Sequence, residues 1–323
     1  MQDVPVKFEK WFAEQNWHIR DYQRGMIDAF SRREDTLLIA PTGGGKTLAG
    51  FLPSLIALAV KEGEAKPKLH TLYISPLRAL TNDIQRNLNR PVAEMNLPIK
   101  IGVRTGDTKQ YQRAKQRKSP PDILLTTPES LMLLLSYPDA AEYFSDLKTV
   151  IIDELHSFAT NKRGDFTALA LARLKSLAPD HIRFGLSATI ADADSAAKWL
   201  GPTGSPAKII EVTGSAPPVL EIMTPETRYP LGGHNPRFAV KDIYAAIQTA
   251  KSAIIFVNTR AQTEHLFQEL WKVNTDNLPI GLYHGSLSRE RRQMTEASIA
   301  SGHIRAVVST SALEMGIDWG DVD

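Results

Sequence analysis

The chain has 323 residues, which at roughly 150 residues per domain predicts two domains. Lysine and arginine total 38 against 36 aspartate and glutamate, so the formal charge of +2 decides nothing about partners. Hydrophobic residues make up 42% and charged residues 23%, which excludes an intrinsically disordered chain. The absence of cysteine excludes a disulfide framework, a thiolate zinc site and a cysteine nucleophile.

The sequence carries no targeting or membrane signal. Met1–Pro5 lacks the basic segment and apolar run with which a signal peptide begins. The longest apolar stretch, Leu48–Val60, contains Gly50 and Pro53 and falls short of the ~18 residues of a membrane span. These features predict an intracellular, cytoplasmic protein.

Short β-branched segments alternate with longer amphipathic segments through the first part of the chain. The expected strands are Thr36–Ala40, Leu69–Ser75, Ile99–Val103, Ile123–Thr127, Thr149–Asp153, Ile182–Ser187 and Lys208–Val212. The expected helices are Thr47–Val60, Leu77–Leu88, Glu129–Leu135, Phe166–Leu177 and Asp192–Leu200. Apolar strands that alternate with helices predict an α/β fold, in which helices cover both faces of a parallel sheet.

Proline and glycine gather between residues 214 and 236, which indicates a linker or a domain boundary. The alternation then resumes, with expected elements at Val240–Ala250, Ala253–Val257, Ala261–Trp271, Ile280–Tyr283, Arg289–Ile299 and Ile304–Ser309. We therefore predict a first domain over residues 1–213, a linker over 214–236 and a second domain over 237–323. The second has fewer strands than the first and no helix after its last segment, so we expect the natural protein to be longer.

A glycine-rich loop follows the first expected strand and opens a helix, which is the context that a P-loop requires. Its residues are Ala40, Pro41, Thr42, Gly43, Gly44, Gly45, Lys46 and Thr47. Consecutive glycines let backbone N–H groups surround a phosphate, and the following helix adds its dipole. We expect Lys46 to contact the β- and γ-phosphates of ATP and the Thr47 hydroxyl to ligate Mg²⁺. The alternative is a glycine-rich turn with a chance Lys-Thr pair, which the flanking strand and helix disfavour.

An apolar strand that begins at Val150 ends in Asp153, Glu154 and His156. We expect Asp153 to hold Mg²⁺ through water, and Glu154 to orient and deprotonate the attacking water. Alone, such a strand end is as well explained by solvated carboxylates. Together with the phosphate-binding loop, it predicts a nucleoside triphosphatase.

Further motifs in the same order resemble the DExH-type helicases of superfamily 2, which are built of two RecA-like domains. The matching segments are Pro76–Leu80, Thr126–Ser130, Asp153–His156, Ser187–Thr189, Phe256–Arg260, Tyr283–Ser286 and Ser309–Asp318. The resemblance covers Gln23 to Asp323 and is closest to the large helicase-related (Lhr) group. Within that group, the sequences of these segments are most similar to those of the bacterial ligase-associated DExH helicases. Alanine at position 40, where the strict P-loop pattern has glycine, agrees with this family.

The resemblance assigns three further residues to the nucleotide. Gln23 would bond the adenine edge, Asp318 would sense ATP between the two domains, and His156 would couple the nucleotide site to the second domain. Each assignment has a simpler alternative. Gln23 is also compatible with a surface helix, Asp318 with a turn and His156 with a loop.

Nucleic-acid contacts are expected where strands give way to helices. The candidates are Arg78, Thr127, Arg163, Thr259, Arg260, His284 and Thr310. Each threonine can equally be a helix N-cap. Arg78 and Arg260 begin helices, where a cation opposes the helix dipole unless a phosphate lies nearby. The basic stretch from Arg104 to Lys118, which includes Tyr111, is compatible with a phosphate-binding surface or with a solvated helix face.

The resemblance implies an ATP- and Mg²⁺-dependent helicase that translocates 3′ to 5′ on single-stranded DNA and acts in DNA repair, with DNA ligase and nuclease repair proteins as partners. The alternatives are a helicase of RNA or RNA–DNA hybrids, and an ATP-dependent DNA translocase that separates no strands. The family's arginine motif that reaches the γ-phosphate would lie beyond Asp323, so residues 1–323 alone are expected to hydrolyse ATP very slowly.

Overall fold

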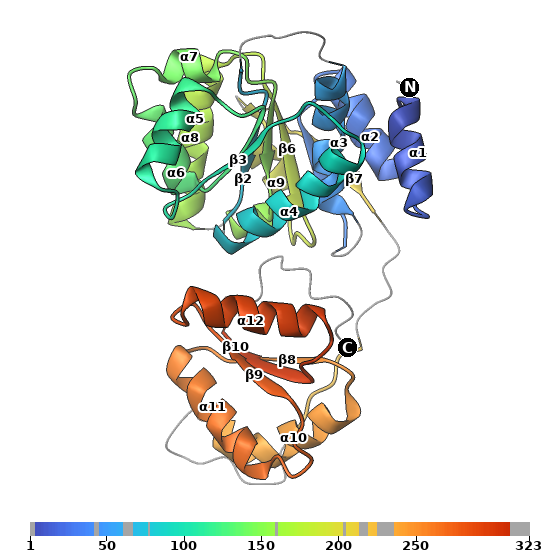
Figure 1. Ribbon diagram of the computed structural model, residues 1–323, viewed down its shortest axis with the longest axis vertical. Helices are drawn as coiled ribbons and strands as arrows, with labels where there is room; N and C mark the ends of the chain where they lie inside the picture. The colour runs from blue at the N-terminus through green and yellow to red at the C-terminus, as the bar shows by residue number, and fades with distance from the viewer. Residues whose placement is uncertain are drawn as a thin grey trace. The chain divides into compact units, whose positions relative to one another are not determined.

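The chain forms two compact units, Met1–Ser215 and Ala216–Asp323, in a computed structural model (Figure 1). The structure describes residues 4–41, 45–60, 67–76, 78–158, 161–202, 205–212, 219–224 and 236–310. Each unit has its own parallel sheet and its own buried apolar clusters.

The sheet of the first unit has seven strands in the order β3-β4-β2-β5-β6-β1-β7, and every neighbouring pair is parallel. The strands are β1 (Thr36–Ile39), β2 (Thr71–Ile74), β3 (Ile101–Arg104), β4 (Ile123–Thr126), β5 (Thr149–Ile152), β6 (Ile182–Ser187) and β7 (Lys208–Glu211). Because all the strands run the same way, the loops that follow them share one edge of the sheet, where ligand sites of open α/β sheets lie.

Nine helices described in the first unit cover both faces of the sheet (Figure 1). They are α1 (Val6–Glu14), α2 (Asp21–Ser31), α3 (Lys46–Ala59), α4 (Arg78–Glu94), α5 (Gln110–Lys118), α6 (Pro128–Leu135), α7 (Ala140–Phe144), α8 (Lys162–Leu177) and α9 (Ala193–Leu200). Successive strand residues face opposite layers, so Leu38 packs with α1–α4 while Leu37 packs with α6–α9. The predicted α/β fold with helices on both faces is confirmed.

Two of the expected helices have bounds that differ by several residues, and α1, α2, α5 and α7 were not among the expected helices. α4 runs to Glu94 rather than ending at Leu88, although it contains Pro91. α8 begins at Lys162 rather than Phe166, because the Asn161 side chain accepts hydrogen bonds from two backbone N–H groups of its first turn. The cap therefore extends this helix towards the loop after β5.

The second unit contains a three-stranded parallel sheet in the order β8-β10-β9. Its described elements are a short 3₁₀ helix (Pro236–Ala239), α10 (Val240–Thr249), β8 (Ala253–Phe256), α11 (Arg260–Val273), β9 (Ile280–Tyr283), α12 (Arg289–Ala300) and β10 (Ala306–Ser309). Val308 packs with α10 and α11 on one face of this sheet, whereas Val307 packs with Ile299 of α12 on the other (Figure 1). Among the described helices, none has both the length and the apolar character that a membrane crossing requires.

Candidate nucleotide and nucleic-acid site

The predicted phosphate-binding loop lies between the end of β1 and the start of α3. α3 begins at Lys46, and Gly45 before it has a φ of +80°. Glycine adopts this left-handed backbone without steric cost, which lets the loop turn directly into the helix. Thr42, Gly43 and Gly44 lie outside the described residues, so their part in the loop stays a prediction.

The acidic pair follows β5, which one strand, β6, separates from β1 in the sheet. Lys46 Nζ lies 3.6 Å from Glu154 Oε1, and both side chains are only 7% exposed. Glu154 has φ 49° and ψ 49°, a left-handed conformation that costs a non-glycine residue about 1–3 kcal/mol. This turn lets the Glu154 backbone N–H donate to Asp153 Oδ1 at 2.9 Å. It also keeps the two adjacent carboxylates within the field of one lysine.

Asp153 is buried, and both of its oxygens accept hydrogen bonds. The second oxygen, Oδ2, accepts from the hydroxyl of Tyr73 on β2. Burial and the neighbouring Glu154 charge raise the pKa of Asp153 to about 6, against the opposing effects of Tyr73 and Lys46. The carboxylate is therefore held in one orientation from two sides.

Tyr73 is a residue that sequence reasoning missed. Its ring stacks on Phe51 of α3 with 5.2 Å between ring centres, so it connects the acidic strand end to the helix after the phosphate loop. The signal that could have found it is a tyrosine inside an otherwise apolar strand, because a buried phenol needs a polar partner.

His156 lies beside Glu154 and the end of β6. Its Nδ1 is 2.9 Å from Ser187 Oγ and 3.4 Å from Glu154 Oε2. The Ser187 hydroxyl donates its proton to the carbonyl of Thr189, so it accepts from His156 and Nδ1 carries the proton. This contact joins the acidic segment to the Ser187–Thr189 segment, two motifs that the sequence placed in separate loops.

Gln23 lies in the first turn of α2 and is buried beside the start of α3, rather than on an exposed face of its helix. Its side chain is buried, and its Oε1 accepts the backbone N–H of Arg20 at 2.9 Å. Its Nε2 lies 3.4 Å from where a Cβ on Gly45 would stand. The structure therefore brings Gln23, Gly45 and Lys46 to the start of α3. Asp318 lies outside the described residues.

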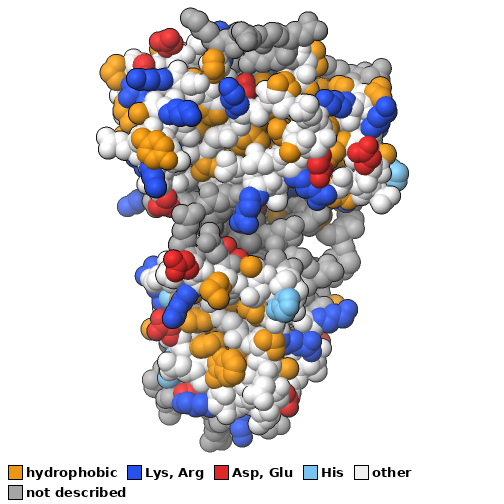
Figure 2. Space-filling model, in the orientation of Figure 1, with side chains coloured by type: hydrophobic (Ala, Val, Ile, Leu, Met, Phe, Trp, Pro, Cys, Tyr) orange, Lys and Arg blue, Asp and Glu red, His pale blue; other side chains and the backbone are white. Residues whose placement is uncertain are grey.

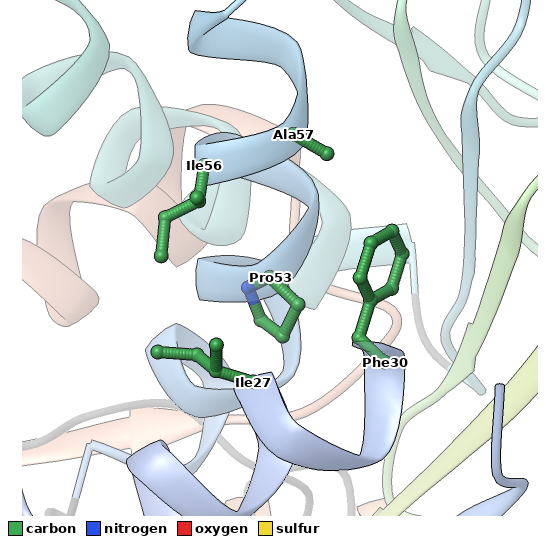
Figure 3. A pocket seen from close by; sticks show the side chains of 5 residues that line it. All are labelled: Ile27, Phe30, Pro53, Ile56 and Ala57. Atoms are coloured by element: carbon green, nitrogen blue, oxygen red, sulfur yellow. The ribbon is translucent and has the colours of Figure 1, made fainter. Parts of the chain in front are cut away.

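An apolar pocket of about 30 Å³ lies between α2 and α3, and none of the charged groups described above lines it (Figure 3). It is lined by Ile27, Phe30, Pro53, Ile56 and Ala57. A cavity of that size and apolar character is suited to no polar ligand. We therefore assign the nucleotide site from the buried charges and not from this pocket.

Several of the predicted nucleic-acid residues lie at helix starts, among them Thr127, Thr259 and Arg260. Thr127 precedes α6, and its hydroxyl donates to Ser130 at 3.3 Å without capping the helix. Thr259 caps α11 by accepting the backbone N–H of Gln262 at 3.2 Å, so the N-cap alternative holds for it. Arg260, the first residue of α11, is exposed.

The remaining nucleic-acid candidates are described to different extents. Thr310 follows β10 and is half-buried. Arg78 begins α4, and the structure does not describe its side chain. His284 is buried, with Nδ1 accepting from the Ser286 backbone N–H and Nε2 3.2 Å from Glu264 Oε1. His284 therefore contacts its own unit.

Arg163 also contacts its own unit. Its Nε and Nη2 donate to the two carboxylate oxygens of Glu129, and its Nη1 donates to the carbonyl of Pro76. The guanidinium is therefore committed to internal partners.

The basic stretch that begins at Arg104 does not form one surface. Arg104 is 1% exposed and donates to the carbonyl of Arg113, so it belongs neither to a phosphate-binding surface nor to a solvated helix face. Tyr111 on α5 is 65% exposed. On the face in Figure 2, basic side chains are scattered among acidic and apolar ones on both units, so no single basic patch on that face marks a nucleic-acid site.

Comparison with known proteins agrees with the geometry around Lys46. Residues 20–196 match the DEAD/DEAH box helicase family, and residues 238–323 match the helicase conserved C-terminal domain. The chain belongs to the DEAD/DEAH box helicase family. The first match contains the described start of α3, the acidic pair and Ser187, which the structure brings together at one edge of the sheet.

Lhr proteins are among the relatives of this helicase chain. It is 37% identical to ATP-dependent helicase Lhr-Core protein 2 of Thermococcus barophilus over 99% of the chain and 39% of that relative. It is 34% identical to the Lhr helicase/uracil glycosylase of Escherichia coli, over 96% of the chain and 23% of that relative. The chain thus spans well under half the length of these relatives.

A solved structure of Mycobacterium smegmatis helicase Lhr, bound to single-stranded DNA and AMP-PNP, is also similar. It shares 35% identity with a TM-score of 0.80, over 98% of this chain and 43% of that protein. The resemblance to the Lhr group and the two RecA-like folds predicted from the sequence are therefore confirmed.

Proposed function

We propose that this chain is the ATP-hydrolysing core of a helicase that translocates 3′ to 5′ on single-stranded DNA. One observation supports the ATPase part above all others. Lys46 Nζ is buried beside Glu154 and has no hydrogen-bond partner among the described residues. A buried ammonium with unused donors suits a ligand that brings several oxygens and negative charge.

The chemistry follows from these groups. Lys46 neutralises charge that develops on the β- and γ-phosphates of ATP, and Glu154 accepts a proton from the attacking water. Phosphoryl transfer needs little more from a protein than such positioning and charge stabilisation. The Ser187 contact with His156 ties the loop that carries Glu154 to the end of β6.

The donors present fit Mg²⁺. Asp153 supplies one buried carboxylate, and Thr47 supplies a hydroxyl in the first turn of α3. Mg²⁺ is usually held by one or two carboxylates together with substrate phosphates and waters. Among the described residues no group of three or more acidic or histidine side chains forms an all-protein site. Asp153 and Thr47 would hold the ion against the nucleotide, where it neutralises phosphate charge.

For the nucleic acid, we propose contacts at the helix starts of Thr127, Thr259 and Arg260, together with Arg78 and Thr310. Contacts to phosphate position a strand without reading its sequence. DNA is favoured because the similar Lhr structure is bound to single-stranded DNA. A DNA-repair role and association with ligase and nuclease proteins stay predictions.

The test is an unwinding assay of the full-length protein with matched DNA, RNA and hybrid duplexes that carry 3′ or 5′ tails. The proposal expects ATP-dependent separation of 3′-tailed DNA and none with Lys46→Ala. Unwinding confined to RNA or hybrid duplexes would replace the DNA assignment. ATP hydrolysis stimulated by DNA with no strand separation would indicate a translocase.

A further inference from the structure

We propose that Arg163 is a positioning residue that couples nucleic-acid binding to ATP hydrolysis by holding both nucleic-acid segments of the first unit to the acidic loop. The inference rests on the proposed helicase function. It assigns to Arg163 a role other than direct contact with phosphate.

Three loops meet at the Arg163 guanidinium. Nε donates to Glu129 Oε1 at 2.8 Å and Nη2 to Glu129 Oε2 at 3.1 Å, a bidentate pair. Nη1 donates to the carbonyl of Pro76. Pro76 follows β2, Glu129 follows β4, and Arg163 itself follows β5.

The strand order explains how the Arg163 guanidinium reaches all three segments. β4, β2 and β5 are consecutive neighbours in the sheet, although they are not consecutive in the chain. Pro76 and Glu129 belong to the segments that resemble nucleic-acid motifs, and the β5 loop carries Asp153 and Glu154. The guanidinium therefore spans three adjacent strand ends, one that leads to the ATPase residues and two that lead to the nucleic-acid segments.

Arg163 is presented from a rigid support. Asn161 caps α8 by accepting the backbone N–H groups of Arg163 and Gly164, at 3.0 Å each. A Cβ at Gly164 would lie 1.7 Å from the carbonyl oxygen of Phe158, so only glycine allows the first turn of α8 to lie this close. Phe158 is buried four positions after Glu154, so the first turn of α8 packs against the segment that carries the acidic pair.

The value of this contact lies in geometry rather than stability. The side chains of Arg163 and Glu129 are 34% and 59% exposed. Ion pairs this exposed add about 0–1 kcal/mol to stability. A cation in the first turn of α8 also opposes the helix dipole, which Glu129 offsets. A residue that adds little to stability but joins three functional loops is expected to act through their relative positions.

The test compares Arg163→Ala and Arg163→Lys with the double charge reversal Arg163→Glu with Glu129→Arg in the full-length protein. Two quantities are measured: the stimulation of ATP hydrolysis by single-stranded DNA, and the factor by which AMP-PNP changes DNA affinity. Allosteric coupling is typically about 5–150-fold in affinity. Arg163→Ala should bring the affinity factor close to one and reduce the stimulation about 10- to 100-fold, as misplaced groups do. The charge reversal should recover part of both quantities.

Arg117→Ala is the matched control. Arg117 pairs with Asp139 at 2.8 Å, with side chains 35% and 40% exposed, and its guanidinium lies over the Tyr137 ring, so these contacts reach none of the three loops. This variant should keep wild-type ATP hydrolysis, stimulation and coupling.

Two other results would overturn the inference. If Arg163→Ala weakens DNA binding equally with and without AMP-PNP, lowers the salt slope by about 0.7 and gains nothing from the charge reversal, then Arg163 contacts phosphate directly. If Arg163→Ala behaves like Arg117→Ala, then the contact has no functional role. A wild type that hydrolyses no ATP, as Lys46→Ala is expected to behave, would instead overturn the proposed function on which the inference rests.

Discussion

Two clusters of buried charged residues lie at opposite ends of the central strands in the first unit, and they differ in how far their hydrogen bonds are satisfied. At the amino end of β6, Arg183 donates to the carbonyls of Leu171 and Leu200 and to His181 Nε2. Its backbone N–H donates to Asp35 Oδ1. Every nitrogen of that guanidinium therefore has a partner within the fold.

Lys46, Asp153 and Glu154 form the cluster at the carboxyl end of the strands, which we call the open cluster. The cluster around Arg183 is called the closed cluster. Lys46 Nζ lies 3.6 Å from Glu154 and has no hydrogen-bond partner among the described residues. Glu154 also holds a left-handed backbone. A satisfied buried cluster stabilises its own fold, whereas a strained cluster with unused donors is organised for a ligand. The comparison therefore separates a structural site from a functional one without reference to any relative.

The largest effect is expected at the open cluster. Glu154→Gln preserves shape but cannot accept a proton, so ATP hydrolysis should fall about 10²–10⁴-fold. ATP binding should persist, which a titration with a fluorescent ATP analogue measures beside the ATPase assay. Loss of nucleotide binding itself would count against Glu154 as the general base.

The closed cluster should respond through stability instead. Arg183→Met removes the guanidinium and leaves the carbonyls of Leu171 and Leu200 without their donor, which should cost about 1–3 kcal/mol for each carbonyl in the free energy of unfolding. Urea denaturation measures this cost, and ATP hydrolysis per folded molecule should stay at the wild-type level. Lys46→Met, in contrast, should remove most ATP hydrolysis per folded molecule. Equal losses of ATP hydrolysis per folded molecule in the two variants would remove the distinction between the clusters.

His181 makes the closed cluster sensitive to pH. Burial, with help from the charges of Arg183 and Lys175, lowers the pKa of His181 to about 4. Below about pH 6.5 the histidine binds a proton in the unfolded chain but not in the folded chain. The contribution of neutral His181 to the free energy of unfolding is therefore complete above pH 6.5. It is lost as pH falls towards 4, in total about 3 kcal/mol.

His181→Asn tests this pH dependence. The asparagine amide can replace the Nδ1 bond to the Ala178 carbonyl and does not titrate. Unfolding free energies at pH 7 and pH 5 should therefore differ less for the variant than for wild type. Burial raises the pKa of Asp35, which acts in the opposite sense near pH 4, so the comparison belongs above that pH. The same pH dependence in both proteins would place the titrating group elsewhere.

The smallest predicted effect concerns Tyr73, which orients Asp153. Tyr73→Phe removes only the hydroxyl that donates to Asp153 Oδ2. It should raise the Mg²⁺ concentration needed for half-maximal nucleotide binding about 10- to 100-fold. Tyr143→Phe is the control, because that buried hydroxyl has no hydrogen-bond partner among the described residues. Equal Mg²⁺ titrations for the two variants would leave Tyr73 with a packing role alone.

The sequence predicts the open cluster better than the contacts around it. β6 and β9 have the bounds expected from their apolar runs. Lys46 and Glu154 could be placed together because loops after parallel strands share one edge of the sheet. α4 continues past Leu88, where the expectation ended it, and includes Pro91 although proline is unfavourable in a helix interior.

The contacts of Tyr73 and Arg163 could not be predicted in the same way. Tyr73 and Asp153 are 80 positions apart, and Arg163 and Glu129 are 34 apart. Both contacts depend on β2 lying between β4 and β5, an order that differs from the order of the strands along the chain. Local pattern fixes which residues stand at strand ends, but only the sheet order decides which ends are neighbours.

The central claim is that the open cluster binds a nucleoside triphosphate through Lys46. The most direct test is the free energy of unfolding with and without Mg²⁺ and AMP-PNP, in wild type and in Lys46→Ala. At a ligand concentration 100 times the dissociation constant, wild type should gain about 2.7 kcal/mol, and Lys46→Ala should lose most of that gain. The same gain in both proteins, or none in wild type, would contradict the claim.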